Sequence, residues 1–190
     1  LVKGDPDSST LKVDLSSSVV SVSTGRVSVS QLFAAVDIDA RDLSSSALSS
    51  VSLTGTTAAN KITGSDYADV IIGGGGADTL IGGAGNDRFV VSKADLSSVV
   101  SIDGGAGVDA LDITGSASET VSINISDLQK VTSIEAVNFV GSGAFSFDGR
   151  GISNGYTIRG GGANDQIVGT NADDTLIGQE GNESLIGGLG

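Results

Sequence analysis

The sequence predicts an all-β fold, an elongated parallel solenoid of short stacked strands. The first observation is composition: 29 of the 190 residues are glycine, and only one is proline. The second is a nine-residue period in which glycine-rich turns alternate with short apolar segments. The third is the enrichment of these segments in Val and Ile, which favour strands. A strand this short is unstable alone, so tandem units are expected to fold by stacking.

The period is clearest in two blocks that share one frame. From Gly55 the chain reads GTTAANKIT, GSDYADVII, GGGGADTLI and GGAGNDRFV, and a single GGAGVDALD follows at Gly104. From Gly160 it reads GGGANDQIV, GTNADDTLI, GQEGNESLI and a truncated GGLG. Position 1 of every unit is Gly. Position 8 is apolar: Ile62, Ile71, Leu80, Phe89, Leu111, Ile167, Leu176 and Leu185. Position 6 is Asn60, Asp69, Asp78, Asp87, Asp109, Asp165, Asp174 and Glu183.

Each unit is expected to form a turn followed by a strand. Six residues rich in Gly, Asn and Asp suit positive-φ turns. The last three residues form a strand whose position-8 side chain points inward. If two units make one coil, each unit stacks on the second one after it. Asp69 then lies near Asp87, Asn60 near Asp78, and Asp165 near Glu183.

Stacked carboxylates indicate a bound cation. Carboxylates held together along one edge repel each other. A hard divalent cation relieves this repulsion, and Ca²⁺ accepts six to eight oxygen ligands, including backbone carbonyls. Mg²⁺ fits less well because it requires octahedral geometry and retains its waters. The spacing of the carboxylates and the glycine-rich turns therefore predict calcium binding.

Composition excludes several other functions. The chain has no Cys and no His, so it can contain no disulfide, thiol nucleophile, zinc finger or Ser-His-Asp triad. Its formal net charge of −13 argues against a nucleic-acid surface. The longest apolar run, Leu32–Val36, is far too short to span a membrane. Because it starts without Met and stops at the opening of another repeat, the chain is expected to be part of a longer protein.

GGGGADTLI and GGAGNDRFV resemble the G-G-x-G-x-D-x-U-x nonapeptide of RTX, haemolysin-type calcium-binding proteins. The resemblance covers 55–90, 104–112 and 160–190. It implies a parallel β-roll with Ca²⁺ between turns, secretion, and folding once external calcium is met. It also implies metal ligands from the position-6 carboxylates Asp69, Asp78, Asp87, Asp109, Asp165, Asp174 and Glu183, and from loop carbonyls at Gly73, Gly75, Gly82, Ala84, Gly160 and Gly162. Glu183 is longer than the family's Asp, and Asn60 is expected to mark an empty cap.

The remaining segments are expected to be strand-rich coils without metal. The predicted organisation is a strand-rich segment at 1–54, a repeat block at 55–112, connecting coils at 113–159 and a truncated block at 160–190. Alternating apolar residues predict strands within 10–30 and at 121–125, 134–139 and 145–147. A looser repeat, Asp95–Ile102 against Asp127–Ile134, predicts short helical turns that lead into strands. Asp42-Leu-Ser-Ser is expected to begin a third.

Four further patterns suggest other functions. Gly151-Ile-Ser-Asn-Gly155 spells the G-x-S-x-G of hydrolases, but the chain lacks His, which favours coincidence. Asp148, Arg150, Arg159 and Asp165 are expected to form a solvated charge cluster rather than a polysaccharide-cleaving site. Thr residues form no regular ice-binding array. The position-9 residues Ile72, Ile81, Val90, Val168, Ile177 and Ile186 form either an outer apolar ladder for lateral assembly or a row covered by neighbouring segments.

The sequence therefore predicts a non-catalytic, calcium-binding structural module of a secreted or cell-surface protein, such as a surface-layer protein or adhesin. The alternative is an export and folding module of a secreted toxin or hydrolase, as in type I secretion, with a catalytic domain elsewhere. Expected partners are calcium ions, with self-association or a cell-surface polysaccharide as further candidates. No nucleic-acid binding and no membrane insertion are expected.

Overall fold

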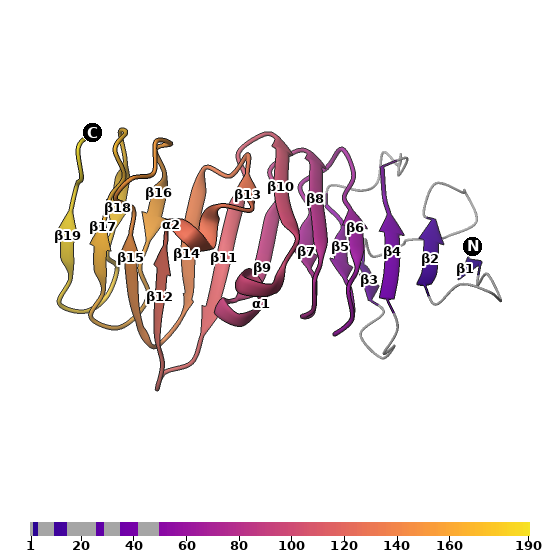
Figure 1. The fold of residues 1–190 in the computed structure, drawn as a ribbon, viewed down its shortest axis with the longest axis horizontal. Helices are drawn as coiled ribbons and strands as arrows, with labels where there is room; N and C mark the ends of the chain where they lie inside the picture. Colours follow the sequence, from indigo (N-terminus) through magenta and orange to yellow (C-terminus); the bar gives the residue numbers. More distant parts are fainter. Residues whose placement is uncertain (1, 4–9, 15–25, 29–34, 42–49) are drawn as a thin grey trace.

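The computed structural model shows an elongated β-solenoid whose short strands lie across its long axis (Figure 1). The residues that the structure describes are 2–3, 10–14, 26–28, 35–41 and 50–190. Strands of successive coils pair in parallel, and in these residues only β1 and β2 pair antiparallel. The predicted all-β parallel solenoid is therefore confirmed.

The strands of the described residues form three sheets, and within each sheet neighbouring strands follow one another in chain order along the axis. Sheet A contains β1 (Val2–Lys3), β2 (Thr10–Asp14), β4 (Ala35–Asp39), β6 (Lys61–Thr63), β8 (Thr79–Ala84), β10 (Ser101–Ala106) and β13 (Val131–Thr132). Sheet B contains β3 (Arg26–Ser28), β5 (Ser52–Thr54), β7 (Val70–Ile72), β9 (Arg88–Ser92), β11 (Ala110–Gly115), β14 (Ala136–Gly141), β16 (Thr157–Arg159) and β18 (Thr175–Ile177). Sheet C contains β12 (Thr120–Asn124), β15 (Ala144–Asp148), β17 (Gln166–Val168) and β19 (Ser184–Ile186).

The number of strands per coil changes along the axis. From β4 to β9 the chain alternates between sheets A and B, so each coil has two strands. The next two coils, β10-β11-β12 and β13-β14-β15, contribute one strand to each of the three sheets. From β16 to β19 the chain alternates between B and C. Sheet B thus runs through both repeat blocks, whereas sheet A serves the first block and sheet C the second.

The position-8 side chains form the interior of the solenoid, except in the last coil, where Leu185 is 44% exposed. In sheet B, Leu53 pairs with Ile71, Ile71 with Phe89, and Phe89 with Leu111. In sheet A, Ile62 pairs with Leu80. All of these side chains are fully buried, and stacking them removes apolar surface from water along the whole axis. The eighteen-residue register of the repeat units confirms that two units make one coil.

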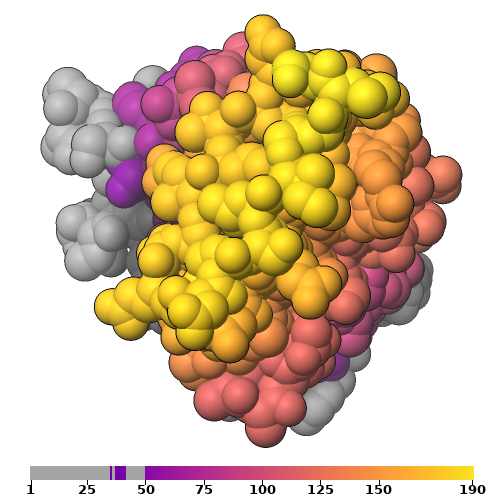
Figure 2. Space-filling model, turned by 90° about the vertical axis from the view of Figure 1, so that its left-hand side faces the viewer, coloured from indigo at the N-terminus to yellow at the C-terminus, as the bar shows by residue number. Residues whose placement is uncertain are grey.

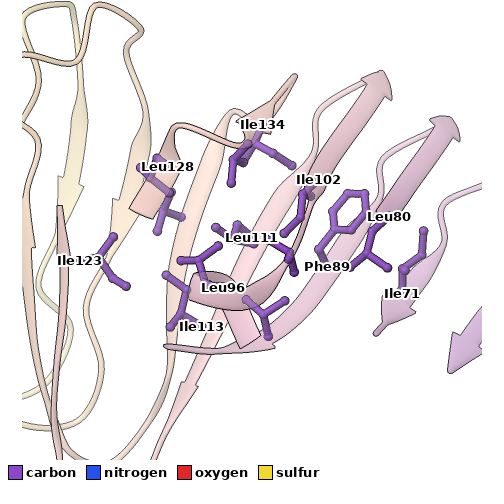
Figure 3. Close-up of a cluster of buried hydrophobic side chains, with 14 of the residues drawn as sticks. Ile71, Leu80, Phe89, Leu96, Ile102, Leu111, Ile113, Ile123, Leu128 and Ile134 are labelled. Carbon is purple, nitrogen blue, oxygen red and sulfur yellow. The ribbon is translucent and has the colours of Figure 1, made fainter. Parts of the chain in front are cut away.

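Two short helices, α1 (Lys93–Ser98) and α2 (Ile125–Leu128), confirm the predicted helical turns. Ser92 and Asn124 cap their N-termini, and in both helices an Asp at the third position completes a capping box. Leu96 of α1 and Leu128 of α2 point into the core beside Leu111 and Ile113 (Figure 3). Each helix leads into a strand of sheet A, as the sequence predicted.

Some predicted boundaries differ from the structure. The strand expected at 121–125 ends at Asn124, because that residue caps α2. The strand expected from 134 begins at Ala136, because Ser133 turns the chain with a φ of 54° and Ile134 is buried in that turn. Strands within 10–30 are seen at β2 and β3. The rest of 10–30 and the helical turn expected at Asp42 lie outside the described residues.

The position-9 residues do not form a continuous apolar ladder among the described residues. In sheet A, Ile81 lies between Thr63 and Asp103, and in sheet B, Ile177 pairs with Arg159. From Ile72 to Ile177 these side chains are half-buried. The exposed exception is Ile186, which lies in the last coil (yellow, facing the viewer in Figure 2) on the edge strand β19. No helix of the described residues is long and apolar enough to cross a membrane.

Candidate metal centre

Buried carboxylates line the turns of the solenoid. Asp69, Asp78, Asp87, Asp109 and Asp165 are each at most 1% exposed, although no Lys or Arg forms an ion pair with any of them in the described residues. Asp174 and Glu183, nearer the C-terminal end, are half-buried. Buried carboxylates without a cation are rare in proteins, because desolvation disfavours the charged form.

The carboxylates form a ladder along the axis. Here "carboxylate ladder" means the position-6 side chains, each of which accepts a hydrogen bond from a backbone N–H one coil nearer the N-terminus. The N–H of Asp69 donates to Asp87 Oδ1 at 2.8 Å, and the N–H of Asp87 donates to Asp109 Oδ1 at 2.7 Å. The N–H of Asp165 donates to Glu183 Oε2 at 2.6 Å. The pairs that the period predicted are therefore adjacent in the structure.

Four members of the ladder have a partner other than an acidic residue. Asp69 and Asp165 accept the N–H groups of Val51 and Phe145, and the other two members are Asp78 and Asp174. Asn60 donates its N–H to Asp78 Oδ1 at 2.8 Å, as the period predicted. Tyr156 donates its N–H to Asp174 Oδ1 at 2.8 Å. Asp174 also accepts the N–H of Thr170, at the start of its own turn, at 2.6 Å. Asp78 and Asp174 thus stack against an amide and an aromatic residue.

Glycine at position 1 is required by the close approach of the carboxylate. A Cβ atom on Gly82 would lie 2.2 Å from Asp87 Oδ2 and 2.3 Å from the carbonyl oxygen of Gly104 on the next coil. Comparable clashes under 3.0 Å would occur at the other position-1 residues Gly64, Gly73, Gly104, Gly160 and Gly169. The recurrence of Gly at this position is therefore explained by packing against oxygen atoms.

Backbone carbonyl oxygens from positions 1, 2 and 4 lie between adjacent coils. The Ser65 and Tyr67 oxygens would be 2.3 Å and 2.6 Å from Cβ atoms on Gly83 and Gly85, whose φ angles are positive. The carbonyl oxygen of Gly82 would lie 2.0 Å from a Cβ atom on Gly64. Each turn therefore brings carbonyl oxygens close to the buried carboxylates.

The other loop residues expected to supply carbonyls lie either against a neighbouring coil or at the outer tip of their turn. Gly73 O lies against Gly55, and Gly160 O accepts a hydrogen bond from the side chain of Gln179. Gly162, at position 3, has open space where a Cβ would be. At Gly75, the other position-3 glycine, a Cβ atom would lie 3.5 Å from Asp95 Oδ1, an ordinary contact distance. Position 3 thus lies at the outer tip of the turn in both blocks. Ala84 is the position-3 residue of its unit and lies at the end of β8.

Several carboxylate oxygens in the ladder lack any partner. Asp87 Oδ2, Asp109 Oδ2 and Glu183 Oε1 are buried and accept no hydrogen bond. Burial, together with the neighbouring carboxylates Asp69 and Asp109, raises the pKa of Asp87 to about 7. Burial likewise raises the pKa of Asp69, Asp78 and Asp109. Unpartnered carboxylate oxygens beside carbonyl oxygens are a donor set that fits a hard cation.

Glu135 is a member of the ladder that the nonapeptide frame did not include. Its Oε2 accepts the N–H of Asp109 at 2.7 Å, and the carbonyl oxygen of Ser133 occupies the place of a position-1 carbonyl against Gly104. The turn here is three residues shorter than the turn of the preceding unit, and the longer side chain of Glu compensates. The sequence signal is the segment Glu135-Ala-Val, which parallels Asp109-Ala-Leu in register.

The other candidate sites do not gather catalytic groups. Ser153 lies in an irregular segment between β15 and β16, and no helix follows it, so the hydrolase elbow is not formed. Asp148 pairs with Arg150 on the surface, as expected of a solvated cluster, whereas Asp165 is buried in the ladder. No group of three or more acidic side chains forms a metal cluster in the part of the chain that the structure describes.

Comparison with known proteins identifies the repeats. Residues 54–89 and 159–190 match the RTX calcium-binding nonapeptide repeat, in four copies. No curated protein and no solved structure matches the chain significantly. The matched segments contain every position-6 carboxylate except Asp109. RTX repeats bind calcium ions. The repeat module itself is non-catalytic. The chain is therefore a β-roll module that contains two blocks of the RTX calcium-binding nonapeptide repeat, at 54–89 and 159–190.

Proposed function

We propose that this chain is a structural module of a secreted or cell-surface protein and that it folds when its carboxylate ladder binds extracellular Ca²⁺. The unpartnered, buried oxygens of Asp87 and Asp109 carry this proposal. Proteins with RTX repeats are typically secreted, and the extracellular space supplies calcium at concentrations that suit modules with dissociation constants of roughly 10⁻⁴–10⁻³ M.

The proposed ligands come from pairs of adjacent coils. Along sheet B they are Asp69 with Asp87, Asp87 with Asp109, and Asp109 with Glu135. Along sheet C they are Asp165 with Glu183. Asp78, at its own turn of 73–81, and Asp174 each supply one carboxylate, and backbone carbonyls complete each set. Bound calcium supplies the positive charge that the ladder lacks.

Charge explains why folding and binding are coupled. The chain carries a formal net charge of −13, which favours an expanded state when calcium is scarce. Stacking the coils brings Asp69, Asp87 and Asp109 together in buried turns, which is unfavourable while all three are ionised. A ligand that binds only the stacked state stabilises it, so the binding free energy becomes folding free energy.

A structural role is supported by the coils between the two blocks, which lie outside the nonapeptide repeats. These coils have an aromatic core in which Phe139 stacks on Phe145 with ring centroids 5.2 Å apart. They are also braced by the Lys93–Asp127 ion pair, which joins α1 and α2. Coils with so much packing of their own favour a rigid, extended part of a surface protein over a compact export signal, the alternative role.

Substitution of Asp87 tests the calcium role. Asp87→Ala removes a carboxylate shared by two adjacent sites, so we expect weaker calcium binding by calorimetry and a smaller gain of β-structure by circular dichroism. Glu119→Ala is the matched control, because Glu119 is exposed on the turn between β11 and β12, outside the ladder. An unchanged calcium response in Asp87→Ala would contradict the proposal.

A further inference from the structure

The side-chain amide of Asn60 lies in a cage of oxygen atoms. Its Nδ2 is 2.6 Å from the carbonyl oxygen of Ala58, 3.0 Å from that of Thr56 and 3.3 Å from that of Gly73. It is also 2.9 Å from Asp78 Oδ1. An amide nitrogen carries two hydrogens, so four surrounding oxygens exceed its donors. This environment resembles that of a small cation.

The four oxygens correspond by position to the ligands proposed for calcium. They are the carbonyls of positions 2 and 4 of the unit itself, and the carbonyl of position 1 and the carboxylate of position 6 one coil further on. In the following unit the same positions are occupied by Ser65, Tyr67, Gly82 and Asp87. There the central side chain is Asp69, a carboxylate, instead of an amide.

The orientation of the amide is defined by its surroundings. Thr56 Oγ1 donates to Asn60 Oδ1 at 3.1 Å, which directs the amide oxygen away from the cage and the nitrogen into it. The reversed amide would direct its oxygen at three carbonyls and a carboxylate. Ser65, at the equivalent position of the next unit, contacts Asp69 through its hydroxyl in the same way. The two turns are thus built alike and differ at position 6.

We propose that the Asn60 amide takes the place of a calcium ion, so that the turn of Gly55–Thr63 closes on Gly73–Ile81 without metal. This inference rests on the proposed calcium function. At this turn one carboxylate, Asp78, faces a neutral group that donates hydrogen bonds, and the repulsion between paired carboxylates is absent. The first coil of the repeat block is then a calcium-independent platform on which the calcium-requiring coils stack.

The test compares the full chain with its Asn60→Asp variant. Bound calcium is counted by native mass spectrometry, and β-structure is followed by circular dichroism in chelator and in calcium. We expect Asn60→Asp to bind one additional ion per chain and to hold less β-structure in chelator, because the introduced carboxylate and Asp78 repel each other without metal. Asn60→Ala is the control: it destabilises the fold in both conditions and gains no ion.

The converse variant, Asp69→Asn, tests the same inference if Asn60→Asp fails to fold. It introduces an amide into the equivalent cage, so we expect one fewer bound ion and a fold that persists at lower calcium. Equal ion counts and equal calcium dependence in wild type and Asn60→Asp would overturn the inference, as would loss of the fold in Asp69→Asn. If the wild type binds no calcium at all, the proposed function itself fails.

Discussion

Glu135 Oε2 accepts a hydrogen bond of 2.7 Å from the backbone N–H of Asp109, although the two residues are separated by a complete three-stranded coil. This contact extends the carboxylate ladder beyond the segments that match RTX repeats. It lies beside Asp109 Oδ2, which has no partner. The ladder therefore continues into a coil whose turn has a different length.

We expect Glu135→Gln to weaken calcium binding at this coil. The amide oxygen of Gln can still accept the Asp109 N–H, so the fold should persist, while one negative charge beside Asp109 is lost. Calorimetry should find either one fewer calcium ion or a weaker site. Glu119→Gln makes the same change of charge on an exposed turn, and identical titrations of the two variants would exclude a role for Glu135.

Two glycine-to-alanine variants should show whether position 1 requires glycine because of close packing. Gly82→Ala places a Cβ 2.2 Å from Asp87 Oδ2. We expect this overpacking to lower the free energy of unfolding by about 1–3 kcal/mol, measured by urea unfolding with calcium present. Gly162→Ala meets open space at the tip of its turn, so its effect should stay within about 0.5 kcal/mol. Equal losses in both variants would refute the packing explanation of position 1.

The calcium-free fold should become more stable as the pH falls. Burial and the neighbouring carboxylates raise the pKa of Asp87 to about 7 in the folded chain, whereas an unfolded Asp titrates at about 3.9. Between these values the folded chain binds the extra proton, so stability is present at low pH and is lost as the pH rises through about 7.

Circular dichroism in chelator at about pH 5 and about pH 8, values on either side of the folded pKa, measures this effect. We expect more β-structure at the lower pH and a smaller difference between the two pH values in Asp87→Ala. Calcium affinity should change in the opposite direction, because protons compete for the same oxygens. A calcium-free chain that is more stable at the higher pH would be inconsistent with a raised pKa at Asp87.

The nine-residue period predicted the solenoid because position 8 of each unit faces the core and position 6 lies in the turn. Leu53, Ile71 and Phe89 stack as that period requires. It also brought Asp69 to Asp87 and Asp165 to Glu183. These features depend on local turn chemistry and on a constant repeat length, both of which are visible in a single sequence.

The change from sheets A and B to sheets B and C could not be predicted in this way. It arises where insertions of different length, including α1 and α2, break the frame and add a third strand to two coils. Glu135 was missed for the same reason, because its turn lacks the glycines that mark the repeat. The Asn60 cage was missed because its oxygen atoms come from two turns, 56–58 and 73–78, that only the folded solenoid brings together.

Far-ultraviolet circular dichroism of the metal-free protein tests most directly whether calcium binding drives the folding of this chain. We expect little β-structure in chelator beyond the coils between the two blocks, a cooperative gain on adding Ca²⁺, and no comparable gain with Mg²⁺. A chain that is fully folded in chelator and indifferent to calcium would contradict the proposed coupling of folding to calcium.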